Sequence, residues 1–189
     1  MLKIALNNWM GGSGKDRCAD YLVEKHGFKK YSLSEGIYKI AYDAYGIEEE
    51  SRPERKLLWH IGESLRAYDK LLWINRTLRK INGEGHDRVV ITDVRKLLEH
   101  SYLGEIGFEN VMIYCDPKVA MERIKKRDGK VDEEELMNNH LENQLRPLQN
   151  HMKNIDNSDD FEETTKELDA FVRFLEDQEK GKVVSGKFH

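Results

Sequence analysis

The chain has 189 residues, of which 35% are charged and 39% hydrophobic, and its formal net charge at pH 7 is −4. That length suits one domain with a substantial core, and the negative charge argues against a general binder of polymeric nucleic acid. The sequence has no apolar stretch of membrane-spanning length and no signal-peptide pattern at its N-terminus. Its two cysteines, Cys18 and Cys115, lie far apart without metal-ligand partners nearby, so we expect a protein of the reducing cytoplasm with no membrane partner.

The first predicted element is a strand at Lys3–Leu6, and a glycine-rich turn follows it. The turn reads Met10-Gly11-Gly12-Ser13-Gly14-Lys15-Asp16 and leads into a helix patterned by Ala19, Leu22 and Val23. This is the layout of a phosphate-binding P-loop, in which backbone N–H groups and a helix N-terminus surround an anion and a lysine adds a charge. The pattern therefore predicts binding of a nucleoside triphosphate by Gly11, Gly12, Ser13, Gly14, Lys15, Asp16 and Arg17.

Two positions depart from the usual pattern of this loop. Trp9 stands where a first glycine is usual, and Asp16 stands where a hydroxyl side chain is usual. We expect Gly11 and Gly12 to supply the backbone freedom that Trp9 lacks. A carboxylate beside phosphates needs a cation, so Asp16 either holds Mg²⁺, directly or through water, or pairs with a basic neighbour. A glycine-rich surface turn before an ordinary helix is the alternative interpretation.

Further strands are predicted at Lys30–Leu33, Arg88–Thr92, Asn110–Cys115 and Lys153–Asp156, with helical spacing of apolar residues between them. This alternation predicts an α/β fold of three layers, with a central parallel five-stranded sheet and helices on both faces. We expect one domain over residues 1–180 and a flexible tail at 181–189. Within the domain we expect a helical region at about 35–82 that binds the acceptor and a small lid at about 124–146.

A second signal lies where the strand Arg88–Thr92 ends, in Thr92-Asp93-Val94-Arg95. An acid at such a strand tip binds Mg²⁺ or the acceptor in phosphate-transferring folds, and an arginine beside it reaches a phosphate bidentately. Asp93 and Arg95 are therefore candidate site residues. A strand end that carries solvent-facing charges is the alternative.

Two helical regions add candidates. Arg66 is a candidate ligand for an acceptor phosphate, and Trp73 is either a core residue or a surface on which a base stacks. Arg123 and Arg127 are four residues apart and share a helix face, where they would neutralise charge on a migrating phosphoryl group once a lid closes. A basic helix C-terminus that complements its dipole is the alternative for this pair.

The segment after these arginines is polar and acidic, and we interpret it as a mobile flap over Asp128–Asn139. His140 and Glu142 follow it, but they lack further ligands at the spacing that a metal site needs. Asn157 follows the last predicted strand and would lie at a strand tip near the P-loop, where an adenine ring could rest.

Taken together, these motifs resemble those of phage deoxynucleoside monophosphate kinases, which carry an aspartate after the P-loop lysine. The resemblance runs from about residue 3 to residue 175 in the expected order. Its motifs are Ser13-Gly14-Lys15-Asp16 with Ala19-Asp20, Tyr31-x-Leu33 with Ile37-x-Lys39, Leu57-Leu58-x-x-Ile61-Gly62 with Leu65-Arg66, Trp73-Ile74-Asn75, Thr92-Asp93-Val94-Arg95, the Arg123/Arg127 pair and His140-x-Glu142. Two residues depart from the resemblance. Trp9 replaces the first glycine of the loop, and Arg17 stands where relatives often have a threonine.

The resemblance implies a P-loop kinase fold and transfer of the γ-phosphate of ATP, with Mg²⁺, to the 5′-phosphate of a deoxynucleoside monophosphate. By this analogy Lys15 holds the β- and γ-phosphates, while Arg66 and Arg95 hold the acceptor phosphate. Arg123 and Arg127 close over the transferred group. The resemblance also allows a homodimer and, for a phage-encoded chain, a location in the host cytoplasm.

Two other functions remain open at this point. One is a P-loop kinase for another small phosphorylated acceptor, such as dephospho-coenzyme A or phosphomevalonate, because those kinases share the P-loop, lid arginines and a strand-tip acid. The other is a nucleotide-binding protein without catalytic activity, which Trp9 and the missing hydroxyl at Asp16 would explain. The base of a nucleotide acceptor cannot be chosen from these residues.

Overall fold

The computed structural model describes residues 1–48, 51, 53–129 and 144–185. The chain divides into two compact units, residues 1–30 with 87–189 and residues 31–86, where the sequence predicted a single domain with a helical region at about 35–82. Among the residues that the structure describes, no helix is both long and apolar enough to span a membrane. Residues 130–139 of the predicted flap and the pair His140 and Glu142 lie outside the described residues.

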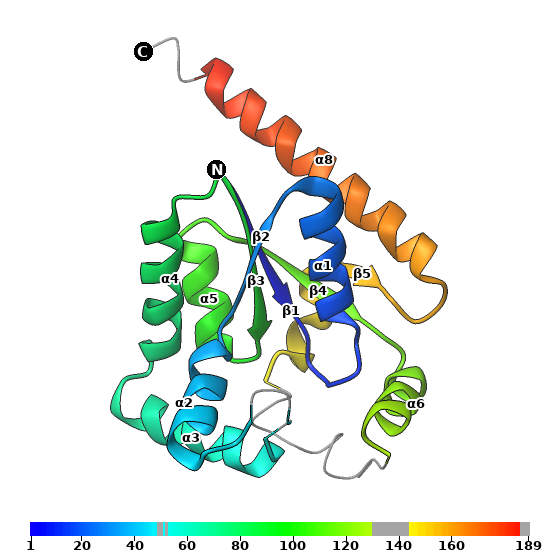
Figure 1. The fold of residues 1–189 in the computed structure, drawn as a ribbon. Coiled ribbons are helices and arrows are strands. Elements are labelled where there is room, and N and C mark those ends of the chain that lie inside the picture. Colours follow the sequence, from blue (N-terminus) through cyan, green and yellow to red (C-terminus); the bar gives the residue numbers. More distant parts are fainter. Residues whose placement is uncertain (49–50, 52, 130–143, 186–189) are drawn as a thin grey trace. The chain divides into compact units, whose positions relative to one another are not determined.

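The fold contains a parallel sheet whose strand order is β2-β3-β1-β4-β5 (Figure 1), and four of these strands lie wholly in the larger unit. The strands are β1 (Leu2–Asn7), β2 (Lys29–Ser32), β3 (Arg88–Val94), β4 (Glu109–Tyr114) and β5 (Lys153–Asp156). β1 pairs in parallel with both β3 and β4, and β4 pairs in parallel with β5. Because parallel strands end at the same edge, the loops after β1, β3, β4 and β5 emerge together there.

Helices cover both faces of this sheet. Alternate residues of a strand point to opposite faces, so Ile4 and Leu6 of β1 join a core cluster with α1 (Lys15–His26) and α8 (Phe161–Ser185). Asn7 contacts His100 of α5 (Leu97–Glu105) with its side chain. β1 is buried on both sides, as its apolar sequence requires. Figure 1 shows α1 and α8 together over one side of the strands.

Residues 31–86 form a smaller unit with its own core. Its helices are α2 (Glu35–Tyr45), α3 (Arg55–Tyr68) and α4 (Leu72–Glu84). Ile37, Ala41, Ile61 and Trp73 form the buried centre, and each comes from the apolar stripe of its helix. The Trp73 indole N–H donates to the carbonyl of Gly62, 3.3 Å away, so α4 is joined to α3 by a polar as well as an apolar contact.

The five predicted strands are confirmed, and each boundary differs by no more than two residues from the prediction. The predicted tail at residues 181–189 is described only as far as residue 185. Helix α8 continues to Ser185, whereas we expected a flexible tail from residue 181. Apolar spacing after Leu175 is weak and the residues are charged, so the pattern lacked the signal on which helix prediction depends.

The contact of α1 with α8 generates a prediction about stability and pH. The Asp169 carboxylate accepts a hydrogen bond from the Tyr21 hydroxyl at 2.9 Å and lies 2.7 Å from His26 Nε2. Burial acts to raise the pKa of Asp169, but the hydrogen bonds from His26 and Tyr21 outweigh it and hold that pKa below its ordinary value. Such a group stabilises the fold at neutral pH and loses its contribution as the pH falls below about 4.

We therefore expect Asp169→Asn to lower the free energy of unfolding at pH 7 by about 1 kcal/mol. The difference from wild type should shrink toward zero as urea unfolding is repeated down to about pH 3. Asp177→Asn is the matched control, because Asp177 lies on the same helix and pairs only with exposed Lys180 among its described contacts. A pH-independent difference would contradict the assignment.

Candidate functional site

The turn after β1 takes the shape of a P-loop because two of its glycines adopt left-handed backbone conformations. Gly12 has φ 81° and Gly14 has φ 80°, values that side chains with a Cβ disfavour. Gly14 is the N-cap of α1, whose first residue is Lys15. We expected Gly11 and Gly12 to provide this freedom; the structure uses Gly12 and Gly14 instead, since φ of Gly11 is not positive.

Trp9 is buried, with 4% of its surface exposed, and so it is part of the core beneath the loop. The guanidinium of Arg146 lies 5.0 Å from the centre of its ring. Arg146 begins the short 3₁₀ helix η1 (Arg146–His151) that leads into β5. Trp9, which stands where glycine is usual, is therefore a packing residue. Its contact with Arg146 joins the start of the P-loop to the segment before β5.

The Lys15 ammonium is held between two carboxylates. Its Nζ lies 2.7 Å from Asp16 Oδ2 and 2.9 Å from Asp93 Oδ1, and the residue is only 8% exposed. Burial acts to lower the pKa of Lys15, but the carboxylates of Asp93 and Asp16 outweigh it and raise that pKa above its ordinary value. Lys15 is therefore a fixed cation at the N-terminus of α1, the position where an anion is most favoured.

Asp93 reaches Lys15 because the end of β3 is distorted. Ala5 pairs with Ile91 but Asn7 pairs with Val94, so β3 carries one extra residue at this point. Asp93 has φ 64° and is, among the described residues, the one non-glycine residue with a positive φ. Such strain gathers at functional sites. Here the carboxylate, of which 12% is exposed, also lies 3.2 Å from Arg95 Nη2.

The backbone after Asp93 is held by a buried acid that the sequence reasoning missed. Glu99 is 2% exposed, and its Oε2 accepts hydrogen bonds from the backbone N–H groups of Arg95 and Lys96 at 3.0 and 3.1 Å. Its place in the first turn of α5 could have predicted this contact, since acids at that position cap helix N-termini. Glu99 thereby holds the segment that carries Arg95.

Asp16 and Arg17 point to different partners. Asp16 pairs with Lys15 and lies 3.6 Å from Lys30 Nζ, which matches one of the two expectations for it, although 61% of its side chain stays exposed. The Arg17 guanidinium lies 3.7 Å from the centre of the Phe161 ring at the start of α8. Arg17 therefore stacks on α8, and Asp16 faces the lysines.

Helix α6 (Pro117–Asp128) brings Arg123 beside the P-loop but takes Arg127 elsewhere. Arg123 Nη1 donates to the backbone carbonyl of Asn157 at 2.7 Å and to Cys115 Sγ at 3.3 Å. A Cβ placed on Gly14 would lie 3.7 Å from the same nitrogen. Arg127 contacts Asp128, with Nε–Oδ1 at 2.7 Å and Nη2–Oδ2 at 2.6 Å. Of the predicted pair, the structure places Arg123 at the P-loop.

Asn157 follows β5 and is 3% exposed. Its Nδ2 donates to the carbonyl of Ser13 at 2.7 Å, so the expected proximity of this strand tip to the P-loop is present. Thr164 of α8, which the sequence reasoning missed, donates to Asn157 Oδ1 at 3.1 Å. No sequence motif predicts this contact, because the two residues meet only after β5 and α8 have packed.

The cysteine thiols near this loop are buried. Cys18 and Cys115 are 0% and 2% exposed, and burial raises the pKa of Cys18 to about 12 and raises that of Cys115 as well. Both are therefore neutral thiols at physiological pH and act as packing residues.

The candidate residues of the smaller unit are described within that unit. Arg66 of α3 pairs with Glu63 at 2.9 Å, and 19% of its side chain is exposed. Trp73 was a candidate for stacking a base, but it is 3% exposed and belongs to the core of the unit. Trp73 is therefore a packing residue in the core of this unit.

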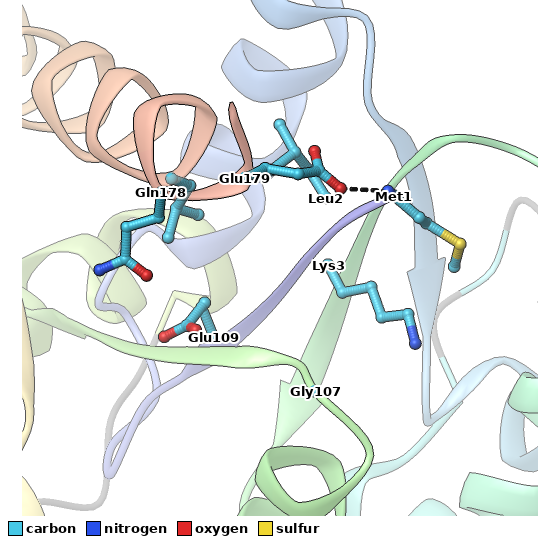
Figure 2. Close-up of a pocket in the computed structure, with 8 residues that line it drawn as sticks. Met1, Leu2, Lys3, Gly107, Glu109, Gln178 and Glu179 are labelled. Atoms are coloured by element: carbon cyan, nitrogen blue, oxygen red, sulfur yellow. Dashed lines mark hydrogen bonds and ion pairs between the residues drawn. The ribbon is translucent and has the colours of Figure 1, made fainter. Parts of the chain in front are cut away.

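A pocket of about 110 Å³ lies at the opposite end of β1 from the P-loop (Figure 2). It is lined by Met1, Leu2 and Lys3 together with residues of α8, and the amino group of Met1 pairs there with Glu179. The pocket contains none of the candidate residues. Within the described part of the chain, no three His, Cys, Asp or Glu side chains are grouped to hold a metal ion.

The geometry of the P-loop generates a prediction for Gly12. A Cβ on Gly12 would lie 2.4 Å from the backbone carbonyl oxygen of Ala120 in α6. We expect Gly12→Ala to cost about 2–4 kcal/mol in the free energy of unfolding, since overpacking adds to left-handed strain. Gly107→Ala is the matched control, because Gly107 has φ 86° with open space around it, and should cost only about 1–2 kcal/mol. Equal losses in urea unfolding would show that α6 does not press on the loop.

Comparison with solved structures places this fold among P-loop kinases. The chain superposes on TT1252 from Thermus thermophilus with a TM-score of 0.63 and 16% identity, covering 92% of this chain and 97% of the other. It superposes on a gluconokinase from Sinorhizobium meliloti 1021 with a TM-score of 0.56 and 18% identity, covering 100% and 98%. For the shikimate kinase from Bacteroides thetaiotaomicron the TM-score is 0.54 and the identity 14%, covering 93% and 98%.

Sequence comparison finds two viral relatives, and a family model matches most of the chain. The chain is 31% identical over 105 residues to the uncharacterized protein ORF77 of Ictalurid herpesvirus 1 (strain Auburn), and 32% identical over 106 residues to its uncharacterized protein ORF76. Each alignment covers 54% of this chain and 46% or 44% of the viral protein, so the chain spans about half the length of these relatives. The AAA domain family (AAA_18) matches residues 10–146, from the P-loop to the residue that packs on Trp9. The chain therefore belongs to the AAA domain family and has the fold of the P-loop kinases.

Proposed function

We propose that the chain is an ATP-dependent kinase that transfers the γ-phosphate of ATP to the 5′-phosphate of a deoxynucleoside monophosphate. The observation that carries the proposal is the buried Lys15 ammonium at the N-terminus of α1, held between Asp16 and Asp93. Phosphoryl transfer depends on positioning and on charge stabilisation more than on a nucleophilic side chain. A fixed cation beside a glycine loop is therefore the principal requirement.

On the donor side, the loop backbone from Gly11 to Gly14 and the Lys15 ammonium bind the β- and γ-phosphates of ATP. When phosphates arrive, Lys15 exchanges a carboxylate contact for a phosphate contact. It stays charged, because phosphate oxygens replace the negative charge that raises its pKa in the free protein. Arg123, which lies beside Gly14, stabilises charge that develops on the transferred group. Arg127 would join it only by leaving Asp128.

On the acceptor side, we assign the phosphate of the nucleotide to Arg66 and Arg95, following the resemblance to deoxynucleoside monophosphate kinases. Arg95 follows the tip of β3, and its backbone N–H is held by Glu99, which favours a defined direction of approach. Asp93 lies between Lys15 and Arg95 and orients both cations.

Asp16 and Asp93 would hold a Mg²⁺ ion only after the Lys15 ammonium has turned from them to the phosphates, because Mg²⁺ prefers oxygen ligands. Mg²⁺ typically takes one or two carboxylates and completes its shell with water and phosphate oxygens. When bound, the ion would neutralise charge on the β- and γ-phosphates of ATP.

A kinase for another small acceptor is the second candidate. The solved structures that share the fold include a gluconokinase and a shikimate kinase, which favours small-molecule acceptors in general without choosing one. A dephospho-coenzyme A-like or phosphomevalonate-like acceptor would use the same Lys15 and Arg123. A nucleotide-binding protein without turnover remains the third candidate.

The proposal is tested by measuring ADP release from Mg-ATP in the presence of each common ribo- and deoxynucleoside monophosphate, with gluconate, shikimate, dephospho-coenzyme A and phosphomevalonate as comparison acceptors. Turnover with one or a few deoxynucleotides is the expected result and identifies the base. Turnover only with a non-nucleotide acceptor would overturn the deoxynucleotide assignment. ATP binding with no turnover across the whole panel would favour the inactive binding protein.

We expect Lys15→Ala to lower kcat/KM by about 10²–10³, since one preorganised charge contact to a transferring group is worth this order. Circular dichroism should show a folded protein. Lys166→Ala is the control, because Lys166 is an exposed lysine of α8 and its loss should leave turnover unchanged. Wild-type turnover in the Lys15 variant would exclude the P-loop role.

Arg66→Ala should raise the KM of the acceptor about tenfold or more and leave the affinity for Mg-ATP unchanged, because a charge-assisted contact to one substrate is lost. Arg79→Ala provides the matched control, as an exposed arginine on the neighbouring helix α4. Steady-state kinetics with both substrates varied would measure the two constants. A lower ATP affinity with an unchanged acceptor KM would reassign Arg66 to the donor.

A further inference from the structure

Asn157 is the residue at which four parts of the larger unit meet. Its backbone N–H donates to the carbonyl of Tyr114 at the end of β4 at 2.9 Å, and its carbonyl accepts from Arg123 of α6 at 2.7 Å. The side chain donates to Ser13 in the P-loop and accepts from Thr164 in α8. The residue is 3% exposed, and its amide nitrogen and oxygen each have a protein partner.

These contacts leave the Asn157 side chain poorly suited to recognise an adenine ring, which was the role expected for it. Nδ2 donates to the Ser13 carbonyl, and Oδ1 lies 3.1 Å from the Thr164 hydroxyl, which also donates to the Asp156 carbonyl at 2.9 Å. The loop is also shaped around this amide, because a Cβ on Gly14 would lie 2.1 Å from Asn157 Nδ2. Gly14 therefore serves two needs, a left-handed φ of 80° and room for the asparagine.

The bond to Ser13 has a consequence for the next N–H group. A peptide unit is planar and trans, so its carbonyl and its N–H point in opposite directions. Holding the carbonyl of Ser13 therefore fixes the N–H of Gly14 on the other side of the same peptide. Backbone N–H groups of this kind bind phosphate in glycine loops, and a buried carbonyl without a partner would favour a rotated peptide.

We propose that Asn157 is a positioning residue for phosphate binding: its amide holds the Ser13 carbonyl so that the Gly14 N–H is presented to the phosphates of the nucleotide. The Thr164 hydroxyl, which also donates to the Asp156 carbonyl at 2.9 Å, favours the amide orientation that donates to Ser13. The contact of Arg123 with the Asn157 carbonyl ties helix α6 to the same point. This inference rests on the proposed binding of ATP at the P-loop and is independent of the acceptor.

The test compares the affinities of wild type and Asn157→Ala for Mg-ATP and for Mg-tripolyphosphate by isothermal titration calorimetry. Tripolyphosphate carries the phosphates without a base. Because the variant leaves a buried carbonyl unpaired, we expect both affinities to fall about tenfold. The KM of the acceptor should remain unchanged.

Three outcomes would overturn the proposal. A loss of affinity for Mg-ATP but not for Mg-tripolyphosphate would show that Asn157 contacts the base. Unchanged affinity for both ligands, together with a lower Tm, would show that Asn157 only stabilises the fold. A wild-type protein that binds neither ligand would contradict the proposed function itself and with it this inference. Ligand binding without turnover on any acceptor would contradict the proposed function alone.

Two further variants separate positioning from stability. Asn154→Ala is the matched control, because Asn154 lies in β5 and donates to the carbonyls of Gln149 and Met152; it should lower the Tm without changing either affinity. Thr164→Val removes the hydroxyl that holds Asn157 Oδ1 and keeps the size of the side chain. It should weaken both ligands about threefold, which keeps the proposal testable if Asn157→Ala does not fold. Wild-type affinity for both ligands in Thr164→Val would contradict the role of the hydroxyl.

Discussion

The structure depends on one constraint, which is that the ammonium of Lys15 is buried and therefore has to be paired. Removing a charge from water is costly unless opposite charges lie close to it. Asp93 and Asp16 supply them at 2.9 and 2.7 Å. The distortion of β3 follows from the same need, because the extra residue and the left-handed backbone of Asp93 bring its carboxylate to the lysine.

The surroundings of the loop also derive from its backbone. A turn that presents N–H groups to an anion leaves carbonyls that need partners elsewhere. The carbonyl of Ser13 is met by Asn157, and the left-handed glycines fit closely against Ala120 of α6 and Asn157. Helix α6, the end of β5 and helix α8 are therefore held together at the loop. This arrangement fixes a charged site at the loop by several contacts, which suits phosphoryl transfer.

Much of this could be predicted from the sequence, because the signals are local. Apolar runs of four to seven residues between helical patterns were sufficient for the five strands, and Gly12 to Lys15 identified the P-loop. Arg123 was predicted on a helix after β4, and the structure brings its guanidinium to the Asn157 carbonyl at the edge where the parallel strands end. Trp73 was ambiguous, because a large aromatic side chain has the same spacing whether it packs in a core or faces a ligand.

The sequence by itself determined the parallel α/β architecture and the position of the anion-binding loop, because periodicity and glycine spacing act over a few residues. Only the tertiary structure decided that Asp93 adopts φ 64°, that Trp9 is buried under Arg146 and that Asn157 holds Ser13. It also decided which glycines of the loop are left-handed. Each of these features joins residues that are distant in sequence or depends on a distorted backbone, and such contacts exist only once the sheet and its helices have packed.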